Sequence, residues 1–348
     1  MASRFSLKFV FATILMVYVL SPIIFKYSLF IQRSLLFMNH VNTNFNFNLS
    51  QPERADLKCT RLLQLERTIS TSSNGGGLSK QNSIVQLGAW HILPQSSLAN
   101  CYTDHTTNRT SIEEKLAFAD SRPVVLYVHG NGGNRAGDHR QRLYRRLAYD
   151  HDYHIITFDY RGYGDSTYEQ PSVDTLTSDT RFMFDWLLKQ KNISKERLIV
   201  WGHSLGTAVA VRMVASLPEH TRPSRLVLEA PFDSMANAIA NHPFSTPFRM
   251  IPYFEYFFVD PIEQSKELNF DSAKSIGNIQ TTPIIILHAE DDGILPFKLG
   301  QNLYEVAAKK LGKQKVKFIQ INGSLGLGHK YICDHDETMS KVKQFVGK

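Results

Sequence analysis

From residue 123 onward, short apolar runs alternate with longer segments whose apolar residues recur at helical spacing. The runs lack regular polar alternation, so they predict strands that are buried on both faces of a mostly parallel sheet. Helices between such strands cover both faces of the sheet, which makes the predicted fold class α/β. The domain is expected to span residues 81–348. Strands are predicted at residues 123–128, 154–159, 198–201, 226–229, 283–287 and 316–321, and helices at 142–149, 178–190, 297–311 and 336–345 and after residue 206.

The chain before residue 123, where this alternation of strands and helices begins, is more polar. Residues 39–80 are rich in Asn, Ser and Gly, and we expect an irregular linker with a flexible Gly-rich loop at 74–77. Residues 84–93 predict a strand, the second half of an antiparallel pair at the edge of the sheet.

The amino-terminal segment contains an uncharged apolar run at residues 9–25, flanked by lysines and arginines. It predicts a transmembrane helix at about 9–28 within a membrane anchor at 1–38. A cleaved signal peptide is the main alternative, but no small-x-small cleavage site precedes the next apolar stretch. Positive charge lies on both sides of the run, so charge does not decide the orientation.

One connection between predicted strands is much longer than a simple crossover requires. Residues 232–282 are therefore expected to form a cap, and they are rich in aromatic residues. These aromatic side chains are expected to line an apolar pocket for an acyl chain, to contact the bilayer, or to pack the cap onto the domain; these readings do not exclude one another. The aromatic residues are Phe244, Phe248, Tyr253, Phe254, Tyr256, Phe257 and Phe258.

The composition and charge of the chain indicate which kinds of binding partner are expected. The 348 residues are 43% hydrophobic and 20% charged, with a formal net charge of +7, which is ordinary globular composition with a basic balance. A stripe of Arg and Lys interleaved with aromatic residues is not found, so nucleic acid is not an expected partner, whereas a membrane fits the charge. The sequence contains no set of ligands at metal spacing, and neither a metal nor another cofactor is expected.

Cysteines and glycosylation sequons bear on the compartment. If the domain is lumenal, Cys59 and Cys101 can pair and leave Cys333 free; if it is cytosolic, all three remain thiols. Asparagine sequons, which are acceptors only in the secretory pathway, favour a lumenal domain. They lie at Asn48, Asn108, Asn192 and Asn322.

The central chemical motif is the stretch 202–206, Gly-His-Ser-Leu-Gly, which follows a predicted strand and precedes a predicted helix. This is the context of a nucleophile elbow, in which a sharp turn lifts the serine above the sheet edge. Ser204 is therefore the candidate nucleophile. Its activation requires a histidine base and an acid that orients the base.

In α/β-hydrolases the acid and the base follow the serine along the chain. The loop after the strand at 283–287 offers Asp292 as the acid, with Asp291 and Glu290 left open. His329 lies in a Gly-rich loop after the last predicted strand, where the base belongs. Backbone N–H groups of Leu205 and Asn131 are the expected oxyanion donors. The Gly-rich loop around Asn131 lacks the G-x-G-x-x-G and G-K-[ST] patterns of nucleotide sites.

Seven stretches of the sequence share a pattern with one known family. They are residues 129–140, 158–166, 201–207, 288–297 and 328–332, with 241–245 and 257–261 in the expected cap. Together they resemble the lysophosphatidylserine lipase family, the α/β-hydrolase-domain protein 12 group. The resemblance implies an α/β-hydrolase fold and a membrane-anchored serine hydrolase whose domain faces the lumen of the endoplasmic reticulum. It implies cleavage of the acyl ester of lysophosphatidylserine, and of monoacylglycerols, by Ser204, Asp292 and His329.

The expected function is hydrolysis of a single-chain lipid ester through an acyl-serine intermediate. Two alternatives use the same fold. The spacing from His329 to Asp334 matches the H-x-x-x-x-D pattern of lipid acyltransferases, and a monoacylglycerol lipase would use the same triad. A non-catalytic scaffold typically lacks the serine or the histidine, and both are present here.

Overall fold

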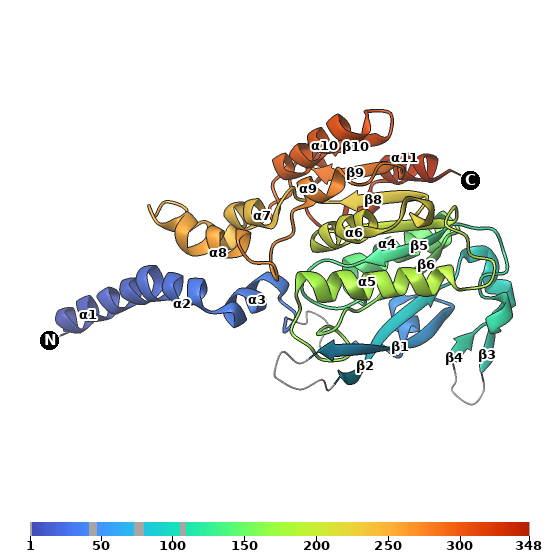
Figure 1. The fold of residues 1–348 in the computed structure, drawn as a ribbon, viewed down its shortest axis with the longest axis horizontal. Helices are drawn as coiled ribbons and strands as arrows, with labels where there is room; N and C mark the ends of the chain where they lie inside the picture. Colours follow the sequence, from blue (N-terminus) through green and yellow to red (C-terminus); the bar gives the residue numbers. More distant parts are fainter. Residues whose placement is uncertain (1, 42–46, 73–79, 105–108, 348) are drawn as a thin grey trace.

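The protein is described here from a computed structural model, which covers residues 2–41, 47–72, 80–104 and 109–347. Within this part of the chain, eight strands form one sheet in the order β1-β2-β6-β5-β7-β8-β9-β10, and β2 runs against the others (Figure 1). The α/β fold with a mostly parallel sheet is thereby confirmed. The strands are β1 (Thr60–Ser72), β2 (Lys80–Ile92), β5 (Val124–Val128), β6 (His154–Phe158), β7 (Leu198–His203), β8 (Arg225–Glu229), β9 (Ile284–Ala289) and β10 (Val316–Ile321); β3 (Tyr102–Asp104) and β4 (Arg109–Ser111) form a separate hairpin.

Helices cover both faces of the sheet, because successive residues of each central strand point to opposite sides. In β5, Leu126 packs into one apolar core and Tyr127 into the other. The first core contains residues of α5 (Val173–Leu188), α6 (Leu205–Ser216), α9 (Ser272–Ile276) and α10 (Phe297–Leu311). The second contains residues of α4 (Asp138–Arg145) and α11 (Asp336–Val346). The carboxyl ends of the parallel strands therefore lie together at one edge, where active sites form in open α/β sheets.

The range 39–80, expected as an irregular linker, contains β1, which pairs with β2 from Thr60↔Ile92 to Ser72↔Lys80. The expectation was wrong for this strand. Leu63, Leu65 and Ile69 are half-buried against the core and alternate with polar residues, as in a strand with one solvent-facing side. The antiparallel pairing expected for 84–93 is confirmed, whereas the loop 74–77 lies outside the described residues.

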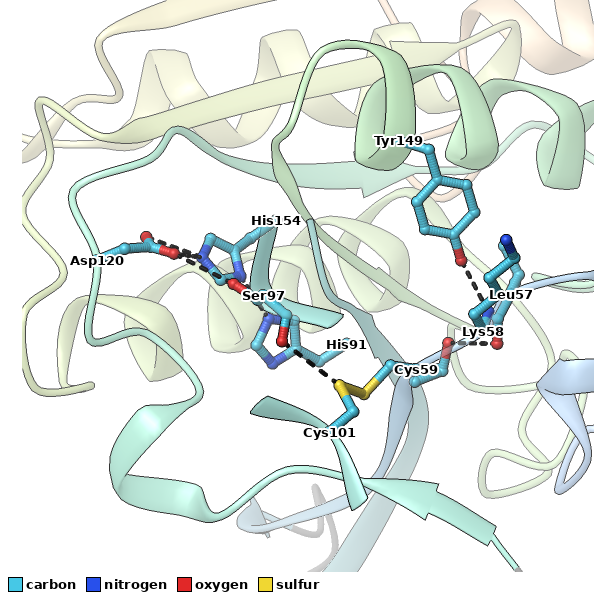
Figure 2. Close-up of a disulfide and its surroundings, with 10 residues drawn as sticks. Leu57, Lys58, Cys59, His91, Ser97, Cys101, Asp120, Tyr149 and His154 are labelled. Carbon is cyan, nitrogen blue, oxygen red and sulfur yellow. Dashed lines mark hydrogen bonds and ion pairs between the residues drawn. A yellow bond between two sulfur atoms is a disulfide. The ribbon is translucent and has the colours of Figure 1, made fainter. Parts of the chain in front are cut away.

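A disulfide ties the start of β1 to the segment after β2. Cys59 and Cys101 are joined, with their Cα atoms 6.5 Å apart, and Cys333 is free and buried. Figure 2 shows this bond close to a buried histidine pair, in which Nε2 of His91 lies 3.0 Å from Nδ1 of His154. The disulfide thus fastens the edge of the sheet to the polar segment that precedes β5.

The amino-terminal helix runs through α1 (Ala2–Leu15), a π-helical turn at Met16–Leu20 and α2 (Ser21–Tyr27), and it extends away from the sheet (Figure 1). Its portion Lys8–Tyr27 is long and apolar enough to cross a membrane. One residue, Ser28, separates α2 from α3 (Leu29–Phe37), and its hydroxyl caps α3 by accepting a hydrogen bond from the N–H of Ile31. The side chain of Gln32 donates hydrogen bonds to two carbonyls at the end of α2. The bend between the two helices is therefore fixed by side chains.

The connection between β8 and β9 covers the range 232–282, which was expected to form a cap. It contains α7 (Met235–Asn241), α8 (Asp260–Glu263) and α9. Figure 1 shows α7 and α8 extending beyond the sheet beside α2, on the side from which the amino-terminal helix projects. In contrast, Leu268, Phe270 and Ile276 are buried in the first core, so the carboxy-terminal part of this connection belongs to the body of the domain.

Candidate active site

Ser204 stands at the turn between β7 and α6 in a strained backbone conformation, with φ at 52°. A positive φ is unusual for a residue with a side chain and marks the sharp turn of a nucleophile elbow. A Cβ atom at Gly202 would collide with the backbone of Gly206, and one at Gly206 would collide with the carbonyl of Val128. The two glycines therefore let α6 start directly against β5 and β7.

His329 and Asp292 meet across the loops after β10 and β9. Nδ1 of His329 lies 2.7 Å from Oδ2 of Asp292, and both side chains are buried. The N–H groups of Ile294 and Leu295 donate to Oδ1 of the same carboxylate at 2.9 and 2.8 Å. The carboxylate thus keeps Nδ1 of His329 protonated and leaves Nε2 as the ring nitrogen that can accept a proton.

The charge of Asp292 is stabilised inside the protein. Burial raises the pKa of Asp292, but hydrogen bonds with His288 and His329 outweigh burial and hold the pKa well below its usual value. Asp292 is therefore a carboxylate over the whole range in which histidine titrates.

The other acids of this loop point elsewhere. Asp291 accepts a hydrogen bond from the N–H of Gly328, and Glu290 accepts one from the N–H of Gly323, so both shape the loop that carries His329. Asp334, the acid of the H-x-x-x-x-D pattern, is exposed and bonded to Arg142. The geometry thus favours Asp292 among the acids left open, and His329 takes Asp292 rather than Asp334 as its carboxylate partner.

His203, inside the elbow, supports the base from the other side. Burial lowers the pKa of His203 to about 3, so the ring is neutral, and its Nε2–H donates to the carbonyl of His329 at 2.9 Å. The backbone of His329 is thereby tied to the strand that carries Ser204.

The expected oxyanion donors come from two different elements next to Ser204. Leu205 is the first residue of α6, and the first N–H groups of a helix have no acceptor within it. Asn131 belongs to the loop after β5 and lines the same cavities as Ser204. Arg140, which is buried, donates to the carbonyls of Gly130 and Gly132 and so stiffens this loop from behind. This support by Arg140 has no local sequence signature and was not predicted.

Two cavities of different character meet at Ser204. The first has a volume of about 280 Å³ and is mainly apolar. The second, of about 240 Å³, is less apolar than the first, and its lining includes two positively charged side chains, Arg140 and Lys330, with His139, His242 and His329. The first is lined by Phe25, Leu35, Leu36, Met38, Asn131, Ser204, Leu205, Phe232, Met235, Ala238, Ile239, His242, Phe244, Ser245, Phe248, Phe258, Ile294 and Leu295. Four of these residues precede β1, and the sequence did not predict that this segment reaches the site.

The remaining predictions concern the surface. Asn48, Asn192 and Asn322 are exposed, whereas Asn108 lies outside the described residues. In the described part of the chain, groups of three or more His, Cys, Asp or Glu side chains that could hold a metal ion are not found.

Comparison with known proteins identifies the family of the chain. Residues 123–248 match the model of the alpha/beta hydrolase fold family. The chain is 37% identical to lysophosphatidylserine lipase ABHD12 of Danio rerio, over 95% of this chain and 81% of the relative. It is 35% identical to the protein of the same name from Rattus norvegicus, over 99% of this chain and 81% of the relative.

A solved structure gives the same fold. The esterase Pf2001 of Pyrococcus furiosus aligns with a TM-score of 0.58 at 18% identity, covering 88% of this chain and 97% of the esterase. The chain is a serine ester hydrolase and belongs to the lysophosphatidylserine lipase family of α/β-hydrolases.

Proposed function

We propose that the protein cleaves the acyl ester of a lysophospholipid, with lysophosphatidylserine as the preferred substrate and monoacylglycerols as further substrates. The observation that carries this proposal is the meeting of an apolar and a positively charged cavity at Ser204. A single acyl chain fits the apolar side. An anionic headgroup fits the side of Lys330, because this exposed ammonium can form charge-assisted hydrogen bonds with phosphate or carboxylate, while buried Arg140 adds positive charge behind the carbonyls that it binds. The names of the relatives support the same substrate class.

The proposed chemistry is acyl transfer to serine and then to water. Oγ of Ser204 attacks the ester carbonyl carbon while Nε2 of His329 takes the hydroxyl proton. The negative oxygen of the tetrahedral intermediate accepts hydrogen bonds from the N–H groups of Leu205 and Asn131. The intermediate collapses when His329 gives its proton to the departing glycerol oxygen, and acyl-Ser204 remains.

The second half repeats these steps with water. His329 takes a proton from a water molecule, the resulting hydroxide attacks the acyl carbon, and the proton returns to Oγ of Ser204. A free fatty acid leaves. Asp292 stabilises the imidazolium form of His329 in both halves and holds the ring in the required tautomer.

The proposed location is the membrane of the endoplasmic reticulum, with one span at Lys8–Tyr27 and the domain in the lumen. The length and composition of the span support membrane anchoring. The Cys59–Cys101 disulfide supports a lumenal domain, because disulfides persist in oxidising compartments. Glycosylation is proposed at Asn48, Asn192 and Asn322, which are exposed, and at Asn108 from its sequon.

The nucleophile is tested with membranes from cells that express the full chain or Ser204→Ala. Lysophosphatidylserine and monoacylglycerol are supplied in parallel, and free fatty acid release is measured. Release from lysophosphatidylserine that disappears in Ser204→Ala is the expected result. Release from monoacylglycerol alone would retain the mechanism and contradict the substrate. Absence of both release and fluorophosphonate labelling of Ser204 would contradict the proposal as a whole.

The headgroup site is tested with Lys330→Ala. Lys330 is exposed at the second cavity, so an ion pair there is worth at most about 1 kcal/mol. The ratio of lysophosphatidylserine to monoacylglycerol hydrolysis is expected to fall roughly threefold, which corresponds to an exposed ion pair of that order. Lys313→Ala, an exposed lysine after α10, is the control and should keep the wild-type ratio. An unchanged ratio in Lys330→Ala would contradict this assignment.

A further inference from the structure

The chain that follows the candidate membrane span contacts the active site directly. We call residues 28–41 the anchor-linked segment; it comprises Ser28, α3 and the four residues after α3. Leu35, Leu36 and Met38 of this segment line the apolar cavity next to Ser204. Phe25, in the last turns of α2, lines it as well. One wall of this cavity is therefore made by the amino-terminal part of the chain rather than by the sheet domain.

The anchor-linked segment is hydrogen-bonded to residues 129–137, the loop between β5 and α4 that carries the proposed donor Asn131, which we call the oxyanion loop. The N–H of Gly132 donates to the carbonyl of Phe37 at 3.2 Å, and the N–H of Gly133 donates to the carbonyl of Val41 at 2.7 Å. The ring of Phe37 is fully buried. The hydroxyl of Tyr163 donates a hydrogen bond to the backbone carbonyl of Phe37 at 2.6 Å. The segment thus holds a defined position beside Ser204.

The opposite wall comes from the connection between β8 and β9, and it also contacts the membrane-spanning helix. The rings of Phe25 and Phe258 are 5.1 Å apart, and those of Tyr18 and Phe248 are 5.9 Å apart. The hydroxyl of Tyr253 donates to the carbonyl of Tyr18 at 2.6 Å, within the candidate span itself. Phe25, Phe248 and Phe258 all line the apolar cavity, so the cavity lies against the end of the span.

Both elements that make this contact expose large apolar side chains. Phe244 and Met250 are 65% and 91% exposed, and Ile24 of α2 is 52% exposed. Large apolar side chains exposed together are typical of surfaces that contact protein or membrane. Here they adjoin a helix that is long enough to cross the bilayer, which identifies lipid as the partner of this surface.

Resting on the proposed function, we propose that the anchor-linked segment is the membrane-side wall of the acyl site. The acyl chain passes from the bilayer into the apolar cavity, which α2 and residues 244–258 help to line. Leu35 limits the length of the acyl chain that this cavity accepts. The ester then lies at Ser204 while the headgroup stays in the second cavity, beside Lys330. The membrane anchor is thus a part of the substrate-binding site as well as a tether.

The experiment uses the full chain in detergent-containing lipid vesicles and a series of p-nitrophenyl esters from butyrate to palmitate. These substrates carry no lipid headgroup, so the test does not depend on the identity of the natural one. Leu35 is half-exposed, and larger side chains there can extend into the cavity without displacing buried residues. Leu35→Phe and Leu35→Trp are compared with Leu29→Trp, which changes an exposed leucine of the same helix outside the cavity lining.

The readout is the ratio of palmitate to butyrate ester hydrolysis within each variant, with fluorophosphonate labelling of Ser204 as the measure of folded enzyme. The ratio is expected to fall in the order wild type, Leu35→Phe, Leu35→Trp, by tenfold or more in Leu35→Trp. Leu29→Trp should keep the wild-type ratio. An unchanged ratio in both Leu35 variants, or an equal fall in Leu29→Trp, would overturn the proposal. A failure of the proposed function would give a different result, because the wild type would then not hydrolyse lysophosphatidylserine, whatever the ester ratios of the Leu35 variants.

Discussion

The side-chain amide of Asn131 donates a hydrogen bond to the backbone carbonyl of Leu36 at 3.1 Å. This contact joins the proposed oxyanion donor, through its own side chain, to α3, the helix that follows the candidate membrane span. The two residues are 95 positions apart in the sequence. The conformation of the oxyanion loop therefore depends in part on the amino-terminal segment.

Asn131→Ala removes this contact but keeps the backbone N–H. One hydrogen bond is worth about 1 kcal/mol, so we expect kcat to fall roughly fivefold for long-chain and short-chain esters alike. KM for the short ester should change little, because the short acyl group makes few contacts with the cavity wall. Steady-state kinetics give both constants. Asn39→Ala removes a similar hydrogen bond, to the carbonyl of Gly162, and an equal loss of kcat there would contradict a positioning role for Asn131.

Asp292→Asn tests the acid of the proposed triad. The amide cannot stabilise the imidazolium and favours the wrong tautomer of His329, so we expect kcat to fall by about 10³- to 10⁴-fold. Fluorophosphonate labelling of Ser204 should slow in parallel. Asp291→Asn, in the same loop, should lose less than tenfold, because among the described residues its carboxylate accepts a hydrogen bond from the backbone of Gly328 and not from His329. A larger loss in Asp291→Asn than in Asp292→Asn would reverse the assignment.

Glu229 predicts a pH-dependent stability. Its carbonyl accepts the N–H of Ser204, and its buried side chain accepts the indole N–H of Trp201 at 2.8 Å. Burial raises the pKa of Glu229 from its ordinary value of 4.5 to about 7, although the hydrogen bond from Trp201 lowers it. The folded protein thus binds this proton more tightly than the unfolded chain, and stability falls as the pH rises from 4.5 to about 7.

Glu229→Gln stays neutral and keeps an acceptor for Trp201, so it should remove this loss. We expect the gain in unfolding free energy to be larger at pH 8 than at pH 5, by roughly 2–3 kcal/mol at about 1.4 kcal/mol per pKa unit. Thermal unfolding at the two pH values in detergent measures the difference. An equal gain in unfolding free energy at pH 5 and at pH 8 would show that the pKa of Glu229 is not raised in the folded protein.

The disulfide predicts a redox-dependent stability. The bond joins residues 42 positions apart, and chain-entropy arguments give a contribution of about 4 kcal/mol for a loop of this length. Cys101→Ser should therefore lower the midpoint of thermal unfolding markedly under non-reducing conditions. Cys333→Ser, which changes the free buried cysteine, should have a much smaller effect. Alkylation of Cys59 and Cys101 in the native, unreduced protein would show that the bond is absent.

The sequence predicted the parts of the site that carry local signatures. Ser204 lies between Gly202 and Gly206, where a larger residue would collide with the backbone, so the motif can be recognised from the sequence. The order of the predicted strands places Asp292 and His329 in the loops after β9 and β10, where the structure has them. The helix predicted at 178–190 begins earlier, at Val173, because Ser172 and Thr175 form a reciprocal cap at its start. That signal is present in the sequence and was overlooked.

Other features have no local signature. Leu35 and Leu36 form part of an ordinary apolar helix, and their position beside Ser204 arises only from contacts between distant parts of the chain. Arg135, also buried, bonds to both Asp159 and Asp165, which fixes the oxyanion loop against the loop after β6. Contacts of this kind depend on which loops the folded sheet places side by side, so they can be identified only from the structure.

The bend at Ser28 has a consequence for where the enzyme acts. The cap of α3 and the hydrogen bonds of Gln32 join the span to the domain without a flexible connection. For a span seated in the bilayer, the height of Ser204 above the lipid and the rotation of the domain are then both set by rigid helices. Such an enzyme hydrolyses esters at one depth of the interface, and membrane thickness becomes a factor that governs its rate.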